Sequence, residues 1–164
     1  MATSDNLTEA AQKFVASKIE YNRDALRDLF KYHSTKQIAE RLGVVKRTVD
    51  LWKQTYKDPS FKNPRKPGAA RHRKIVSMLK DNPKVLAARA GELKQVKVSI
   101  KAKITIGDDT RDRKISHTLK GDKAEQFLKN AVDPDEEGDA WSLYFGDFSG
   151  YYTELDDLEY VTIE

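Results

Sequence analysis

Hydrophobic positions recur at helical spacing through the first half of the chain and switch to strict alternation in the second. Residues 7–20, 25–32 and 34–54 carry apolar residues three and four positions apart, which is typical of amphipathic helices. From Val96 to Ile106 every second residue is apolar, and this period of two predicts a half-buried strand. The pattern predicts an α+β protein, with an all-α N-terminal part and a small C-terminal α+β part.

The segment from Ser34 to Gln54 predicts two short helices joined by a tight turn. It begins with Ser34 and Gln37, the S-x-x-Q pattern in which each side chain satisfies a backbone donor of the other residue. Gly43 follows the first helix where a left-handed backbone is easiest to adopt, so the chain turns sharply there. With the preceding helix, these elements predict a three-helix unit around one small core.

Within this segment, the letters IAERLGVVKRTVDLWK resemble the helix-turn-helix of resolvase-like and transposase-like domains, phage regulators and phage small terminase subunits. That family commonly has a capping serine where this chain has Val45. The resemblance implies that helix 46–54 enters the major groove of DNA with its first residues against base edges. By position, the implied DNA-binding residues are Lys46, Arg47, Asp50, Lys53 and Gln54, together with Thr35 and Lys36 at the start of the first helix.

The chemistry of these side chains agrees with direct contact to bases. Arg47 and Lys46 suit guanine or phosphate oxygens, and Asp50 suits a cytosine amine. Two alternatives stay open: the polar residues form only a solvated helix face, or the two helices bind a protein.

Prolines and cations crowd the chain after Trp52, which predicts a linker with connecting helices over residues 57–94 between domains at 1–56 and 95–164. A basic segment beside a helix-turn-helix can follow the DNA backbone or enter the minor groove. The alternative is a connector with incidental charge. The candidate phosphate contacts are Lys62, Arg65, Lys66, Arg71, Arg73 and Lys74.

In the C-terminal domain, Gly107 to Asp109 predict a hairpin turn, and residues 119–132 return to helical spacing. The aromatic remainder predicts two or three further strands, which gives a ββαββ arrangement. Aromatic residues pack well across strands, and they are also common at protein interfaces. Two interpretations stay open: most of these residues form the core and the solvated faces of the strands, or they form an interface for dimerisation or a protein partner. The candidate partner-binding residues are Trp141, Tyr144, Phe148, Tyr151 and Tyr152.

The net charge of +4 conceals a strong polarity along the chain. Residues 1–95 contain 21 Lys and Arg against 10 Asp and Glu, whereas residues 96–164 contain 9 against 16. Because an acidic surface repels phosphate, we expect the first part to face DNA.

The chain lacks the residues that are typical of metal-binding, nucleotide-binding and catalytic sites. The chain has no cysteine and 3 histidines at spacings unlike a zinc motif, and it contains no glycine-rich phosphate loop. We therefore expect no metal, no cofactor and no enzymatic activity. The beginning of the chain lacks a secretion signal and no apolar run is long enough to span a bilayer, so we expect a cytoplasmic protein without membrane contact.

The sequence thus predicts a sequence-specific protein that binds double-stranded DNA, a transcriptional regulator of phage, plasmid or bacterial type, acting as a homodimer. One alternative is a phage DNA-packaging or replication adaptor, similar to a small terminase subunit, whose C-terminal part docks a partner. Another is a host-directed inhibitor with an acidic C-terminal interaction domain.

Overall fold

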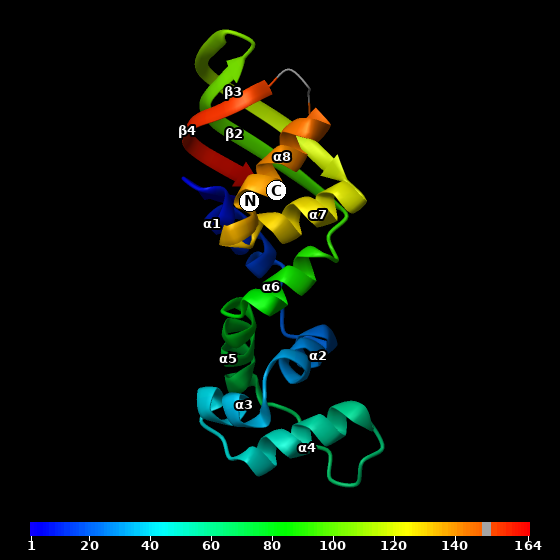
Figure 1. Cartoon of the computed structure of the whole chain (residues 1–164). Helices are drawn as coiled ribbons and strands as arrows, with labels where there is room; N and C mark the ends of the chain where they lie inside the picture. The colour runs from blue at the N-terminus through cyan, green and yellow to red at the C-terminus, as the bar shows by residue number, and fades with distance from the viewer. Residues whose placement is uncertain (149–151) are drawn as a thin grey trace. The chain divides into compact units, whose positions relative to one another are not determined.

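The computed structural model describes residues 1–148 and 152–164 of a mixed α+β protein (Figure 1). Within these residues it has eight α-helices and one four-stranded antiparallel sheet, which confirms the expected mixture of helix and sheet. The chain forms two compact units. We call residues 1–18 and 86–164 the sheet unit, and residues 19–85 the helical unit.

The sheet has the strand order β1-β4-β2-β3, with bounds Ala2–Ser4 for β1, Gln95–Ile106 for β2, Asp109–Lys120 for β3 and Tyr152–Ile163 for β4. β2 and β3 form the expected hairpin, and Gly107 in its turn has a φ of 60°. The expected alternation along β2 is confirmed, because the buried residues are Val96, Val98, Ile100, Ala102 and Ile104.

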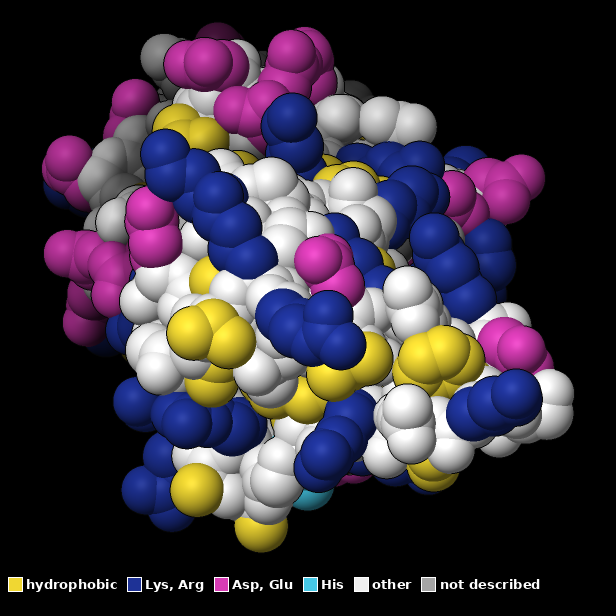
Figure 2. Space-filling view, turned by 90° about the horizontal axis from the view of Figure 1, so that it is seen from below, with side chains coloured by type: hydrophobic (Ala, Val, Ile, Leu, Met, Phe, Trp, Pro, Cys, Tyr) yellow, Lys and Arg dark blue, Asp and Glu magenta, His cyan; other side chains and the backbone are white. Residues whose placement is uncertain are grey.

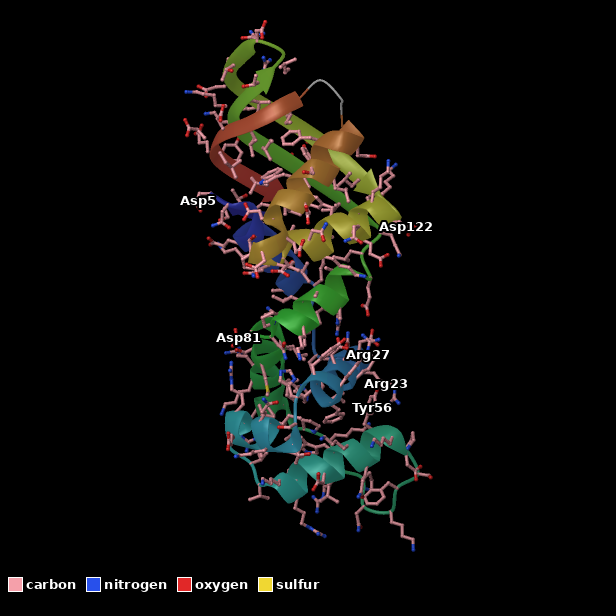
Figure 3. The ribbon with its side chains drawn as sticks, viewed as in Figure 1. Asp5, Arg23, Arg27, Tyr56, Asp81 and Asp122 are labelled. Carbon is pink, nitrogen blue, oxygen red and sulfur yellow. The ribbon has the colours of Figure 1, made fainter. Side chains whose placement is uncertain are left out.

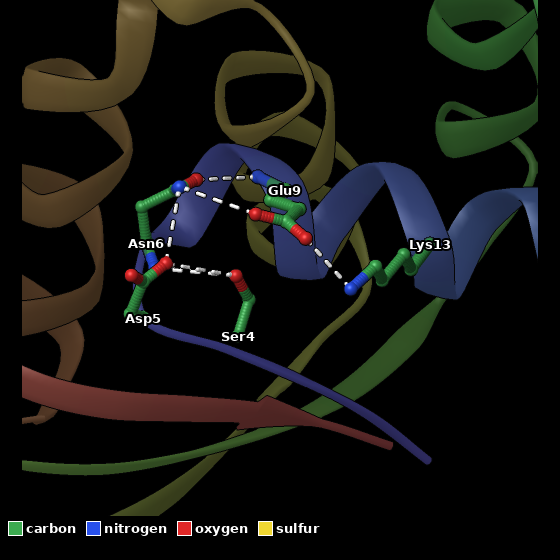
Figure 4. Close-up of polar contacts among 5 residues, drawn as sticks. All are labelled: Ser4, Asp5, Asn6, Glu9 and Lys13. Atoms are coloured by element: carbon green, nitrogen blue, oxygen red, sulfur yellow. Dashed lines mark hydrogen bonds and ion pairs between the residues drawn. The ribbon is translucent and has the colours of Figure 1, made fainter.

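Three α-helices pack on the sheet: α1 (Leu7–Ser17), α7 (Asp122–Ala131) and α8 (Glu137–Phe148), the last preceded by the 3-10 turn η1 (Pro134–Glu136). The side chain of Asn6 caps α1 by accepting a hydrogen bond from the Glu9 amide at 2.7 Å, and Glu9 pairs with Lys13 one turn later (Figure 4). This cap fixes where α1 begins, directly after β1.

Two features differ from the sequence-based expectation. The first residues belong to the sheet unit, because Ala2 to Ser4 pair with Val161 to Ile163 of β4 and α1 packs on β1, β4 and α7. The segment from Glu137 to Phe148 is the helix α8, so the predicted extra strands are reduced to β4 alone. Its apolar residues lie three and four positions apart, and burial of that helical face outweighs the strand preference of aromatic residues.

The helical unit contains α2 (Arg23–Tyr32), α3 (Thr35–Leu42), α4 (Lys46–Lys57) and α5 (Ala69–Lys80), and α6 (Pro83–Ala90) crosses its boundary with the sheet unit. α3 packs on α4, and α5 packs on both α2 and α3. The core is made of fully buried aliphatic side chains, which include Leu29, Ile38, Leu42, Val49, Ile75 and Leu79. No helix in the described ranges is both long and apolar enough to cross a membrane.

The turn between α3 and α4 requires glycine at position 43. It has a φ of 67°, and a Cβ added there would meet no atom within 4 Å, so the cost of a side chain is conformational only. We expect Gly43→Ala to lower the free energy of unfolding by about 1–2 kcal/mol, measured by urea denaturation.

The matched control is Gly146→Ala, which makes the same chemical change inside α8, also with open space around the new Cβ. Because alanine stabilises a helix more than glycine does, the free energy of unfolding of this variant should rise by about 0.5–1 kcal/mol. Equal effects of the two substitutions would contradict a special role for the Gly43 turn.

Candidate nucleic-acid interface

Local hydrogen bonds define both the start of α3 and the turn between α3 and α4. Ser34 Oγ accepts a hydrogen bond from the Gln37 amide at 3.1 Å, and Gln37 Oε1 accepts one from the Ser34 amide at 2.9 Å, which is the expected capping box. After Gly43, the Val44 amide donates to the Ala39 carbonyl at 3.0 Å. The capping box fixes where α3 begins, and the Val44 bond fixes the direction in which the chain leaves α3 toward α4.

α4 has one buried face and one exposed polar face. Val49, Trp52 and Thr55 are buried. At 3.6 residues per turn, the opposite face holds the residues that the sequence predicted as DNA contacts. Its exposed members are Lys46, Arg47, Asp50, Gln54 and Lys57.

Three of the predicted contact residues also form hydrogen bonds with one another inside the unit. Lys53 Nζ donates to Thr35 Oγ1 at 2.7 Å, and Thr35 Oγ1 donates to Asp50 Oδ1 at 3.4 Å. Lys53 and Thr35 are only half-exposed, unlike Lys46, Arg47 and Lys36. This cluster ties the start of α3 to the middle of α4, so Thr35 and Lys53 help to orient the exposed face.

The beginnings of α4 and α5 differ from those of the preceding helices. Asparagine or serine side chains cap α1, α2 and α3, whereas the N-cap residues of α4 and α5, Val45 and Gly68, form no side-chain hydrogen bond. Neither start has an acidic residue in its first turn. Cations near the positive end of a helix dipole and uncapped amide groups both reduce helix stability, and an anion at the same position reverses both effects.

The basic loop, residues 58–68, is attached to the rest of the helical unit through its last four residues. The Arg65 amide donates to Thr55 Oγ1 at 2.8 Å, and the Pro67 carbonyl lies 3.0 Å from His72 Nε2. Pro67 is buried, whereas the predicted phosphate contacts Lys62, Arg65 and Lys66 are exposed. The loop is therefore an anchored part of this unit, where the sequence had predicted an arm or linker.

The predicted cations of α5 divide into two kinds. Arg71 is half-buried, and its Nη1 donates to the Leu42 carbonyl at 2.8 Å, so it satisfies the end of α3. Arg73 and Lys74 are exposed. Sequence spacing alone did not separate these roles, because they depend on how α5 packs against α3.

A pocket of about 370 Å³ lies beside the second half of α4 and combines aromatic rings with cations. Arg23 stacks on Tyr56 with its guanidinium carbon 4.4 Å from the ring centre (Figure 3), and it donates to the Tyr56 carbonyl at 3.3 Å. Burial raises the pKa of the Tyr21 hydroxyl, which is also in the lining. Among the residues that the structure describes, no acidic one lines the pocket, and Arg65 and Lys66 at its rim add to the basic surface.

The two units carry net charges of opposite sign, as the two parts of the sequence do. The helical unit has 17 Lys and Arg against 7 Asp and Glu, a net charge of +10, and the sheet unit has 13 against 19, a net charge of −6. Several acids of the helical unit have local partners: Asp28 pairs with Arg27, Asp81 with Arg41, and Asp58 accepts from Ser60. Figure 2 shows Lys and Arg side chains spread over the middle and lower part of the face that it presents, whereas Asp and Glu lie mainly toward its edges.

The predicted partner-binding residues have different positions in the sheet unit. Tyr144 is fully buried and its hydroxyl donates to the Val98 carbonyl at 3.0 Å, so it belongs to the core and not to a surface. Trp141 is half-exposed and stacks near Phe145. Tyr151 lies outside the described residues, as do the side chains of Phe148 and Tyr152.

No family model matches this chain, and no match was found among the curated proteins or the solved structures.

His33, at the end of α2, has a hydrogen-bond environment that favours the neutral ring. Burial is the main cause that lowers its pKa. Nδ1 lies 3.2 Å from the Leu29 carbonyl, and Nε2 lies 3.0 Å from the amide nitrogen of Asn82. Because Asn82 Oδ1 accepts from the Lys84 amide, its NH₂ group is turned toward the ring. A second proton on His33 would place two donors against each other.

This geometry predicts a pH dependence of folding. The pKa of His33 is lower in the folded than in the unfolded protein, so the unfolded state binds more protons below the ordinary value of 6.5. The free energy of unfolding should therefore decrease as the pH falls below about 6.5. In the His33→Gln variant this free energy should decrease less steeply. Urea unfolding at several pH values measures both slopes, and parallel curves for the two proteins would contradict the assignment.

Proposed function

We propose that this protein binds double-stranded DNA sequence-specifically, with α3, the Gly43 turn and α4 acting as a helix-turn-helix. α4 enters the major groove and contacts base edges with Lys46, Arg47, Asp50 and Gln54. Lys36, Arg73, Lys74 and the basic loop contact the phosphate backbone. The observation that carries the proposal is the exposed cationic face of α4, whose opposite face is buried and whose first turn has no cap.

The energetics of the free protein support this proposal. Lys46 and Arg47 have no salt bridge to any described residue, and they lie at a helix start where cations are unfavourable. A bound phosphate would neutralise these cations and accept hydrogen bonds from the free amide groups. The cations at the start of α4 therefore destabilise the helix in the free protein and become favourable when an anion is bound.

The role that fits this activity is that of a transcriptional regulator. A single helix-turn-helix makes a small interface with DNA, and dimers reach higher affinity and specificity by placing two such units on half-sites. We propose that the acidic sheet unit, which would repel phosphate, forms the contact with a second copy or another protein. Trp141 is the half-exposed candidate for that contact.

The first test of the proposal is Arg47→Ala on a duplex chosen by selection from random DNA. Loss of a bidentate contact to guanine should weaken binding to the preferred site by about 1–3 kcal/mol while changing nonspecific binding less. Fluorescence anisotropy on preferred and scrambled duplexes measures both affinities.

The matched control is Lys114→Ala, which removes one exposed positive charge from β3 of the sheet unit. This variant should bind both duplexes as the unchanged protein does. Equal losses from both substitutions would show a general charge effect and contradict base contact by Arg47.

The second test is Arg65→Ala, in the basic loop. The Arg65 backbone amide holds the loop to Thr55, so the substitution removes the cation and leaves this anchor in place. We expect weaker binding to every duplex and a salt dependence whose logarithmic slope falls by about one unit. Titrations at several salt concentrations give the slope; an unchanged slope would place Arg65 away from phosphate.

A further inference from the structure

Val45 is a large hydrophobic residue that the structure leaves in solvent. The residue is 68% exposed. Among the described residues, Met1 is the other large hydrophobic residue that is exposed. Val45 is the residue directly before α4, whose first two residues are Lys46 and Arg47. An apolar side chain therefore lies among the cations at the start of the proposed DNA-contacting helix.

Local stability does not account for valine at this position. Val45 is the N-cap of α4 and forms no side-chain hydrogen bond there, whereas serine or asparagine would cap the helix. Its exposure means that it also gains little from burial in the core. Valine thus forgoes the stability that a polar cap would provide.

The backbone fixes the position of Val45 relative to α4. Its carbonyl accepts hydrogen bonds from the Thr48 amide at 3.0 Å and the Val49 amide at 3.5 Å, so the residue is attached to the first turn. Its β-branched side chain has few rotamers. A contact made by the Val45 methyl groups therefore requires little further ordering.

We propose that Val45 is a specificity-determining residue that contacts the 5-methyl group of a thymine in the major groove. This proposal rests on the DNA-binding function proposed above. The thymine methyl is the apolar group that the major groove presents, and the first residues of a recognition helix lie closest to base edges. Lys46 and Arg47 would bring the phosphate and base contacts, and Val45 the apolar contact beside them.

Replacement of single thymines by deoxyuridine tests the proposal, because it removes only the 5-methyl group. The full chain is titrated against its selected duplex and against duplexes with one such replacement each. Three variants are compared: Val45→Ala, Val45→Ser and, as the matched control for a neighbouring contact, Lys46→Ala.

We expect one thymine in each half-site at which the unchanged protein loses about fourfold in affinity when the methyl group is removed. Val45→Ala and Val45→Ser should bind thymine and deoxyuridine equally at that position. Lys46→Ala should bind more weakly but keep the preference. Val45→Ser should also melt at a higher temperature, because serine caps α4.

Three results would overturn the inference while leaving the DNA-binding function intact. The first is a selected site at which no thymine replacement changes affinity. The second is a preference that survives in both Val45 variants. The third is an oligomer that dissociates in those variants, which would assign Val45 to a protein contact. Failure of the unchanged protein to bind any duplex would refute the proposed function as well.

Discussion

Burial of one face of α4 is the constraint on which the candidate interface depends. Val49 and Trp52 are withdrawn from water on that face, so the polar residues on the opposite side must point outward. Gly43 lets the chain reverse quickly enough for α4 to pack on α3, and the Thr35–Lys53 hydrogen bond joins the two helices at the surface. The exposed cations are therefore positioned by the core and not by contacts of their own.

The two units differ in the sign of their net charge. The helical unit carries a net charge of +10 and has uncapped, cationic starts at α4 and α5, whereas the sheet unit carries −6. The basic loop adds cations to the helical unit, and its attachment to Thr55 means that they are presented in a defined place. A polyanion is the ligand class that gains most from this arrangement.

Sequence periodicity was sufficient for the elements whose structure is local. The capping box at Ser34, the Gly43 turn and the alternation along β2 follow from residues close in the chain, as does the exposed face of α4. Sequence periodicity did not predict β1, a three-residue strand that pairs with β4 at the far end of the chain. The prediction also failed for α8, whose aromatic residues favour strands although their spacing is helical. Spacing did not separate the packed Arg71 from its exposed neighbours.

The most direct test of the account is amide hydrogen exchange of the full chain with and without a selected DNA duplex, at low salt. If α4 lies in the major groove and the basic loop follows the backbone, added DNA should slow exchange in residues 43–54 and in the basic loop. Residues 95–120 of the sheet unit should exchange at the same rate in both samples. Protection confined to the sheet unit, or no protection anywhere, would contradict the central claim.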